Sequence, residues 1–242
     1  MDILTIEAVS NCMWCAAEHI DYDGWLLQFA GGYTRRPNSV TILQPSTLPL
    51  AEKLAYCEAE YAKRNLPTQF KMLPALSHTN EDVFLESHGY TLDESNWVMT
   101  STLSPQPIPI DSYFTQFDSE WMEAFVRMKH LSTTHSVAHA AILERVTGKT
   151  CYATVRRDGQ IVAVGLGIVE ETYCGIYDVV TDERYRGQGL ARHMMEQLLA
   201  VSSDWGAEHA FLQVAGNNTV ALKLYRGLGF VEAYQYVYRV KA

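Results

Sequence analysis

A strand, a glycine loop and a helix follow one another between residues 177 and 199, and this order strongly constrains the fold. Residues 177–181 are mostly β-branched or aromatic, which is typical of a buried strand. A polar loop then leads to Gly187 and Gly189, and apolar side chains recur with helical spacing from Leu190 onwards. The segment therefore predicts a sheet strand that passes through a tight turn into a helix packed on the sheet.

The start of this helix is a candidate anion site. The first turn of a helix has free backbone N–H groups and the positive end of the helix dipole. Glycines let a phosphate approach the backbone closely, and Arg186 and Arg192 add positive charge. The segment has no Gly-Lys-Ser/Thr ending and only two glycines, so it is neither a nucleotide P-loop nor a GxGxxG motif. Taken alone, it is equally compatible with an ordinary glycine turn.

A second pattern lies downstream. Asn218, Ala221 and Tyr225 have the spacing of one helical face and precede Gly229-Phe230. The pattern Arg-x-x-Gly-x-Ala at residues 186–191, followed by this helix, resembles the GCN5-related N-acetyltransferase (GNAT) superfamily. The resemblance covers residues 112–242 well.

The resemblance implies an α/β fold in which a central, mostly antiparallel, twisted sheet is flanked by helices. The N-terminal half repeats the order of elements weakly, and His88-Gly89-Tyr90 corresponds there to Leu228-Gly229-Phe230. The chain therefore resembles tandem GNAT proteins. We expect a degenerate domain over residues 1–104, a proline-containing linker over 105–111 and a catalytic domain over 112–242. Two prolines within residues 44–49 remove amide donors, so we expect the N-terminal half not to bind CoA.

The implied cofactor is acetyl-CoA, acting as a co-substrate without a metal. Its pantetheine arm is expected to pair with the backbone of one strand, and its pyrophosphate to bind the amides of the glycine loop. The residues implied are Val179, Val180, Thr181, Arg186, Gly187, Gln188, Gly189, Leu190, Ala191, Arg192, Asn218, Ala221 and Tyr225.

The resemblance also implies catalytic roles. The N–H of Val179 is expected to face the thioester carbonyl and stabilise the oxyanion. Tyr225 is expected to donate a proton to the leaving thiolate, although a core aromatic is the alternative. Asn218 would bind the cofactor, cap its helix, or do both.

An amine acceptor must lose a proton before it attacks, because an alkylammonium has a pKa of about 10. The candidate bases are Asp178, Glu170 and Glu171. Asp178 comes first because it lies on the strand nearest the reacting carbonyl. The expected activity is the transfer of acetyl from acetyl-CoA to a primary amine of a small molecule or peptide, by direct attack. The alternatives are another acyl donor, a hydroxyl acceptor, or a non-catalytic acyl-CoA-binding sensor or scaffold.

The composition of the chain limits the classes of partner that we expect it to bind. A net charge of −9 argues against nucleic acid, and the apolar runs are too short for a membrane span. Five cysteines, an odd number, fit reduced thiols in the cytoplasm. Cys12 and Cys15 have CxxC spacing without a second pair, which favours a helix packed in a core over a zinc site. The protein is expected to be a monomer or a homodimer.

Two further features remain open. His135 and His139 have i, i+4 spacing without a third ligand nearby, so an exposed or substrate-facing pair is favoured over a metal site. Residues 34–39 form a basic turn. It is either a plain hairpin loop or a segment that packs on the C-terminal half or binds a substrate anion.

Overall fold

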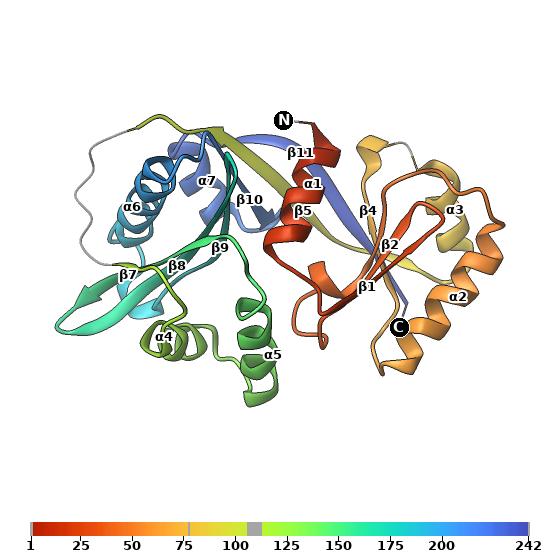
Figure 1. The fold of residues 1–242 in the computed structure, drawn as a ribbon, viewed down its shortest axis with the longest axis horizontal. Helices are drawn as coiled ribbons and strands as arrows, with labels where there is room; N and C mark the ends of the chain where they lie inside the picture. Colours follow the sequence, from red (N-terminus) through yellow and green to blue (C-terminus); the bar gives the residue numbers. More distant parts are fainter. Residues whose placement is uncertain (1, 77, 106–112, 242) are drawn as a thin grey trace.

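The computed structural model describes residues 2–76, 78–105 and 113–241 (Figure 1). Except for Pro105, the expected linker lies outside the described residues. The N-terminal half contains α1 (Ile3–Met13), β1 (Glu18–Tyr22), β2 (Trp25–Phe29), β3 (Val40–Ile42), α2 (Leu50–Lys63), β4 (Gln69–Met72), α3 (Thr79–Ser87) and β5 (Thr91–Thr102). The sequence predicts strands over residues 24–29, 39–43, 69–73 and 97–103 and helices over 50–64 and 81–87, and the structure contains all six. Of α1, the sequence predicts only a helix at the cysteine pair, and it does not predict β1.

The C-terminal half contains β6 (Tyr113–Phe114), α4 (Ser119–Lys129), α5 (Thr133–Leu143), β7 (Lys149–Arg157), β8 (Gln160–Glu170), β9 (Tyr173–Thr181), α6 (Leu190–Asp204), β10 (His209–Ala215), α7 (Thr219–Gly227) and β11 (Val231–Val240). These include the helices predicted over residues 119–130, 136–146, 190–199 and 220–226 and the strands predicted over 151–155, 161–169, 175–181, 211–214 and 235–240, whereas β6 was not predicted. The turn between β7 and β8 has positive φ angles at Asp158 and Gly159, as a tight two-residue hairpin requires.

The described strands form one sheet in the order β1-β2-β3-β4-β11-β5-β10-β9-β8-β7-β6. The pairs β3–β4 and β9–β10 are parallel, and the other described pairs are antiparallel. The sequence resemblance predicted this mixed, mostly antiparallel α/β fold, and the structure confirms it.

The two halves exchange their last strands. β11, at the C-terminal end of the chain, lies between β4 and β5, and β5 lies between β11 and β10. The two long strands cross the middle of the molecule in Figure 1. β5 begins six residues before the predicted start at Trp97, because its first part pairs with β11 and its last part with β10.

Helices cover both faces of the C-terminal part of the sheet. Side chains of α4 and α5 share one apolar cluster with Tyr152, Val164 and Leu166. Side chains of α6 and α7 share a second cluster with Cys151, Ala153 and other residues of the opposite sheet face. The side chains of β7 and β8 are divided between the two clusters, as expected for strands that are buried on both faces.

Helix α1 lies at the centre of the molecule, next to the crossing strands (Figure 1). Glu7 on α1 is fully buried and accepts hydrogen bonds from Lys71 Nζ on β4, at 2.5 Å, and from Tyr234 Oη on β11, at 2.7 Å. Burial lowers the pKa of Lys71, whereas Glu7 opposes that change. This buried polar cluster therefore ties α1 to both halves of the chain.

Candidate active site

A β-bulge lies in the middle of β9. The register between β8 and β9 shifts between Val164 and Leu166, whose partners are Val180 and Tyr177. Two residues of β9, Asp178 and Val179, therefore stand opposite one residue of β8. Asp178 has a φ of 54°, a left-handed conformation that is uncommon outside glycine. Bulges of this kind redirect side chains and end strand pairing, and they are frequent beside active sites.

The sheet opens beyond the bulge. The parallel pairing of β9 with β10 runs from Tyr173 to Ile176 and stops there. On the other side, β8 still pairs with Val180 and Thr181. Among the described strands, none pairs with β9 on the β10 side from Tyr177 to Thr181. The backbone edge at Val179 is therefore available to an extended ligand, as the sequence predicted.

The glycine loop leaves the first turn of α6 uncovered. Gly187 and Gly189 have φ angles of 76° and 79°, and Gly189 precedes the helix without a side-chain cap. A Cβ at either glycine would meet no atom within 4 Å. The free amides at this helix start face open space, which is the arrangement that binds phosphate groups.

A cavity of about 670 Å³ joins this loop to the open edge of β9. It is lined by all the cofactor residues that the sequence predicted except Gln188, together with Met128, Lys129, Tyr185, Val220 and Leu224. We call it the larger cavity. Its lining includes Val179 at the bulge in β9 and Leu190 to Arg192 in the first turn of α6.

Asn218 and Tyr225 lie on α7, beside the larger cavity. The side chain of Asn218 accepts a hydrogen bond from the Ala221 N–H at 3.1 Å, so it caps the helix. Both residues also line the cavity, so capping does not withdraw Asn218 from it. Burial raises the pKa of Tyr225 to about 12. Its phenol therefore keeps its proton at neutral pH, as a proton donor must.

A smaller cavity of about 270 Å³ adjoins the larger one. The two share Lys129, Val179, Asn218 and Tyr225. The smaller cavity is also lined by Asp178, the other catalytic residue that the sequence predicted, and by Tyr33, Thr34 and Arg36 from the N-terminal half. The expected donor site thus meets a second compartment at Val179 and Tyr225.

His139 on α5 forms a hydrogen bond with the Asp178 carboxylate. Nε2 of His139 lies 2.8 Å from Oδ2 of Asp178, and the histidine side chain is fully buried. Its ring packs against Phe125, Tyr33 and Trp14, with centroid distances of 4.6, 5.1 and 5.8 Å. The expectation of an exposed histidine pair is therefore wrong for His139, because this apolar surface encloses it, whereas His135 is exposed.

The other two candidate bases lie elsewhere. Glu170 ends β8, and Glu171 is in the turn before β9, so both precede the strand whose far part carries Asp178. Neither lines either cavity. Glu170 instead accepts a hydrogen bond from the Cys12 thiol, at 3.5 Å. Of the three carboxylates, Asp178 alone faces a cavity at the bulge.

The basic turn at residues 34–39 packs on the C-terminal half. The guanidinium carbon of Arg36 lies 5.3 Å from the ring centre of Trp14 and 5.2 Å from that of Tyr177. Tyr33 packs against His135 and His139 on α5. The interpretation as a plain hairpin loop is therefore wrong. The sequence left this alternative open but held no signal that the turn would reach the cavity.

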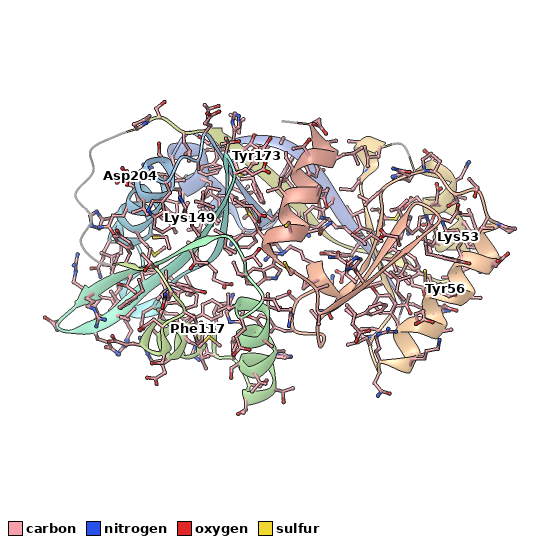
Figure 2. All side chains as sticks on the ribbon, in the orientation of Figure 1. Lys53, Tyr56, Phe117, Lys149, Tyr173 and Asp204 are labelled. Atoms are coloured by element: carbon pink, nitrogen blue, oxygen red, sulfur yellow. The ribbon has the colours of Figure 1, made fainter. Side chains whose placement is uncertain are left out.

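In the N-terminal half, a side chain of the protein itself binds the amides of the segment that corresponds to the glycine loop. The carboxylate of Asp23 accepts hydrogen bonds from the N–H groups of Thr47 and Leu48, both at 2.9 Å. Figure 2 labels Lys53, which lies on α2 at the right of the view. Its buried ammonium donates to Asp23 O at 2.6 Å and to Ser46 Oγ at 2.8 Å. A protein carboxylate thus takes the amides that would face a phosphate.

The cysteine pair does not form a core helix. Cys12 is exposed on α1, and Cys15 lies beyond the end of that helix and is partly exposed. Within residues 2–76, 78–105 and 113–241, no three His, Cys, Asp or Glu side chains come together as metal ligands. In the same part of the chain, no helix has the length and apolarity needed to cross a membrane.

Comparison with known proteins assigns this geometry to a family. The family described as "Probable histone acetyltransferase Rv0428c C-terminal" matches residues 1–239. The "Uncharacterized N-acetyltransferase YobR" of Bacillus subtilis is 26% identical over 246 residues, covering 99% of each chain. The ribosomal protein bS18-alanine N-acetyltransferase of Escherichia coli K12 is 30% identical over 77 residues, covering 32% of this chain and 52% of that protein.

Solved structures share the fold at low sequence identity. A GCN5-related N-acetyltransferase from Sphaerobacter thermophilus matches with a TM-score of 0.66 and 21% identity, covering 90% of this chain and 76% of that one. A tandem GNAT protein from the clavulanic acid biosynthesis pathway matches with a TM-score of 0.61 and 11% identity, covering 97% and 86%. The chain therefore has the fold of GCN5-related N-acetyltransferases, and it is an acetyltransferase that belongs to the Rv0428c C-terminal family.

Proposed function

We propose that this acetyltransferase takes acetyl from acetyl-CoA and transfers it to a primary amine by direct attack. The observation that carries the proposal is the meeting of two cavities at Val179 and Tyr225. A thioester that lies in the larger cavity would have its carbonyl at this junction. An amine in the smaller cavity would reach that carbonyl from the side of Asp178.

The larger cavity suits a CoA ester. The uncovered amides at the start of α6, with Arg186 and Arg192, supply the donors and positive charge that a pyrophosphate needs. The open edge of β9 offers backbone groups to the amides of a pantetheine arm. Both features line one cavity, as a nucleotide thioester requires.

Three residues carry the reaction: Asp178, Val179 and Tyr225. Asp178 accepts a proton from the ammonium, and the neutral amine attacks the thioester carbon. The N–H of Val179 stabilises the oxyanion, an effect worth about 3–4 kcal/mol in other acyl-transfer enzymes. The C–S bond then breaks and Tyr225 protonates the thiolate. The Tyr225 phenolate takes the second proton from the nitrogen, so the neutral amide and CoA leave, and Asp178 returns its proton to solvent.

One experiment tests donor, acceptor and catalysis together. The purified chain is incubated with acetyl-CoA and a panel of primary amines and alcohols, and thiol release and acetylated product are measured. Calorimetry with acetyl-CoA and with CoA runs in parallel. Acetylated amine supports the proposal. Tight binding of acetyl-CoA without product from any acceptor would instead support a non-catalytic acyl-CoA sensor.

A further inference from the structure

The smaller cavity carries charges of both signs. Asp178 is the one carboxylate among its described lining residues, and Arg36 and Lys129 are its cations. Oδ2 of Asp178 is bonded to His139, which fixes the carboxylate in place at the bulge. An acceptor in this cavity therefore meets an anion at the reaction centre and cations elsewhere on the wall.

In the part of the chain that the structure describes, Arg36 differs from two other arginines, Arg35 and Arg127, in having no carboxylate partner. Its neighbour Arg35 pairs with Asp93 at 2.7 Å, and Arg127 pairs with Asp182 at 2.8 Å. Within the described residues, the Arg36 guanidinium has no carboxylate within ion-pair distance and no side-chain hydrogen bond. The faces of Trp14 and Tyr177 hold it in position. Stacking of this kind leaves the N–H groups at the guanidinium edge free to bind a carboxylate in a bidentate manner.

Thr34 adds a second unused group. Its Oγ1 is buried, and across the described part of the chain it has no hydrogen-bond partner. It lines the same cavity as Arg36. A buried hydroxyl without a partner is costly and uncommon in folded proteins. A carboxylate on the acceptor would supply the missing partner for both side chains.

We propose that the acceptor is a small amino acid-like zwitterion, which carries its amine and a carboxylate on one molecule. This inference rests on the proposed function. The carboxylate binds Arg36 and Thr34, and the amine faces Asp178 and Tyr225. A cavity of about 270 Å³ is at the small end of ligand sites, which fits a molecule of this size. Two cations on the wall disfavour a polyamine.

The test compares matched acceptors. Thiol release from acetyl-CoA is measured with the protein amino acids, their amides, dipeptides and alkyl diamines. We expect kcat/KM for the best free amino acid to exceed that for its amide by about tenfold to a hundredfold, the usual worth of a hydrogen-bonded charge. Arg36→Met should lower kcat/KM for the amino acid by the same factor, chiefly through KM, and leave the amide almost unchanged.

Two variants control for structure. Arg35→Met removes the neighbouring arginine, which is already paired with Asp93, and should leave the preference for the carboxylate intact. Arg36→Lys keeps a positive charge and should retain part of the preference. Thermal denaturation shows whether Arg36→Met folds. If it does not, the loss of preference in Thr34→Val, relative to Thr34→Ser, gives the same readout.

The failures are distinguishable. If amides and diamines react as fast as free amino acids, and Arg36→Met changes nothing, the acceptor class is wrong while acetyl transfer stands. A preference for dipeptides would point instead to peptide N-termini. If no amine is acetylated, the proposed function fails. The carboxylate site is then judged by calorimetry of amino acids with the CoA-loaded protein, where equal binding to Arg36→Met would overturn it.

Discussion

Nε2 of His139 lies 2.8 Å from Oδ2 of Asp178, so a buried ring on α5 fixes the carboxylate at the bulge of β9. The two residues lie 39 positions apart in the sequence. Trp14 and Tyr33, from the N-terminal half, complete the surface around the imidazole. The N-terminal half therefore contributes side chains to the candidate active site.

Asp178→Asn should lower kcat/KM about a hundredfold, since general-base catalysis commonly contributes that much or more. The measurement is steady-state acetylation with an alkylamine. A hydroxylamine-type acceptor, which is already neutral at pH 7, should lose much less. The matched control is Glu170→Gln, which removes a carboxylate at the end of β8, outside both cavities, and should leave the rate unchanged. Equal losses with both acceptors would exclude Asp178 as the base.

Tyr225→Phe should lower kcat about tenfold or more, because the thiolate would leave without a proton donor. Binding of acetyl-CoA, measured by calorimetry, should stay nearly the same. Because burial raises the pKa of Tyr225 to about 12, this phenol should cause no alkaline decline in the activity of the native enzyme below about pH 11. An unchanged kcat would show that Tyr225 only packs in the core.

Gly189→Glu should abolish measurable binding of acetyl-CoA, since a carboxylate would project into the space in front of the α6 amides. Gly206→Glu is the control. Gly206 also has a positive φ and open space around it, at the C-terminal end of the same helix. Both variants therefore carry comparable backbone strain. Binding that survives in Gly189→Glu would place the pyrophosphate elsewhere.

Glu7→Gln should destabilise the protein by about 3–5 kcal/mol, because it leaves the Lys71 ammonium buried without its counter-charge. The free energy of unfolding in urea measures the loss. Glu120→Gln breaks the exposed pair with Arg156 and should cost about 1 kcal/mol or less. A loss for Glu7→Gln no larger than this control would show that α1 contributes little to joining the halves.

Asp23→Asn tests the filled pseudo-site through its pH dependence. Hydrogen bonds, first from the Thr47 hydroxyl and then from the Leu48 N–H, hold the pKa of Asp23 below its ordinary value of 3.8. A lowered folded-state pKa stabilises the native state above the unfolded pKa, and this contribution is lost as the pH falls through the folded value. The variant should be less stable at pH 7, and the difference should shrink below about pH 4. Calorimetry should still give one acetyl-CoA per chain.

The order of elements in the C-terminal half could be predicted because each element is locally consistent with its periodicity. The glycine loop and helix start at residues 186–191 could be predicted for the same reason, since both lie within one short stretch, and the binding of a cofactor there stays a prediction. The exchange of β5 and β11 could not, because strand pairing is a long-range choice that the alternation of side chains does not encode.

The residues around the smaller cavity were also only partly predictable from the sequence. Asp178 was predicted from its place on the strand, but the roles of His139 and Arg36 depend on packing between the halves. His139 sits among apolar residues on α5, and nothing in that pattern indicates a carboxylate partner. Trp14, which supports Arg36, follows the last residue of α1. The sequence predicts a helix at Cys12 and Cys15 but not the start of α1 or its place between the halves, because the apolar and polar residues of α1 are poorly segregated around the helix.

The exchange of the last strands has a consequence for biosynthesis. A ribosome makes the chain from the N-terminus, so β4 and β5 emerge long before β11, the strand that must lie between them. The N-terminal half therefore has two unpaired strand edges until β11 has been made, a state that favours association with other chains. Removing Val231–Val240 would leave a gap at the centre of the sheet, not a frayed end.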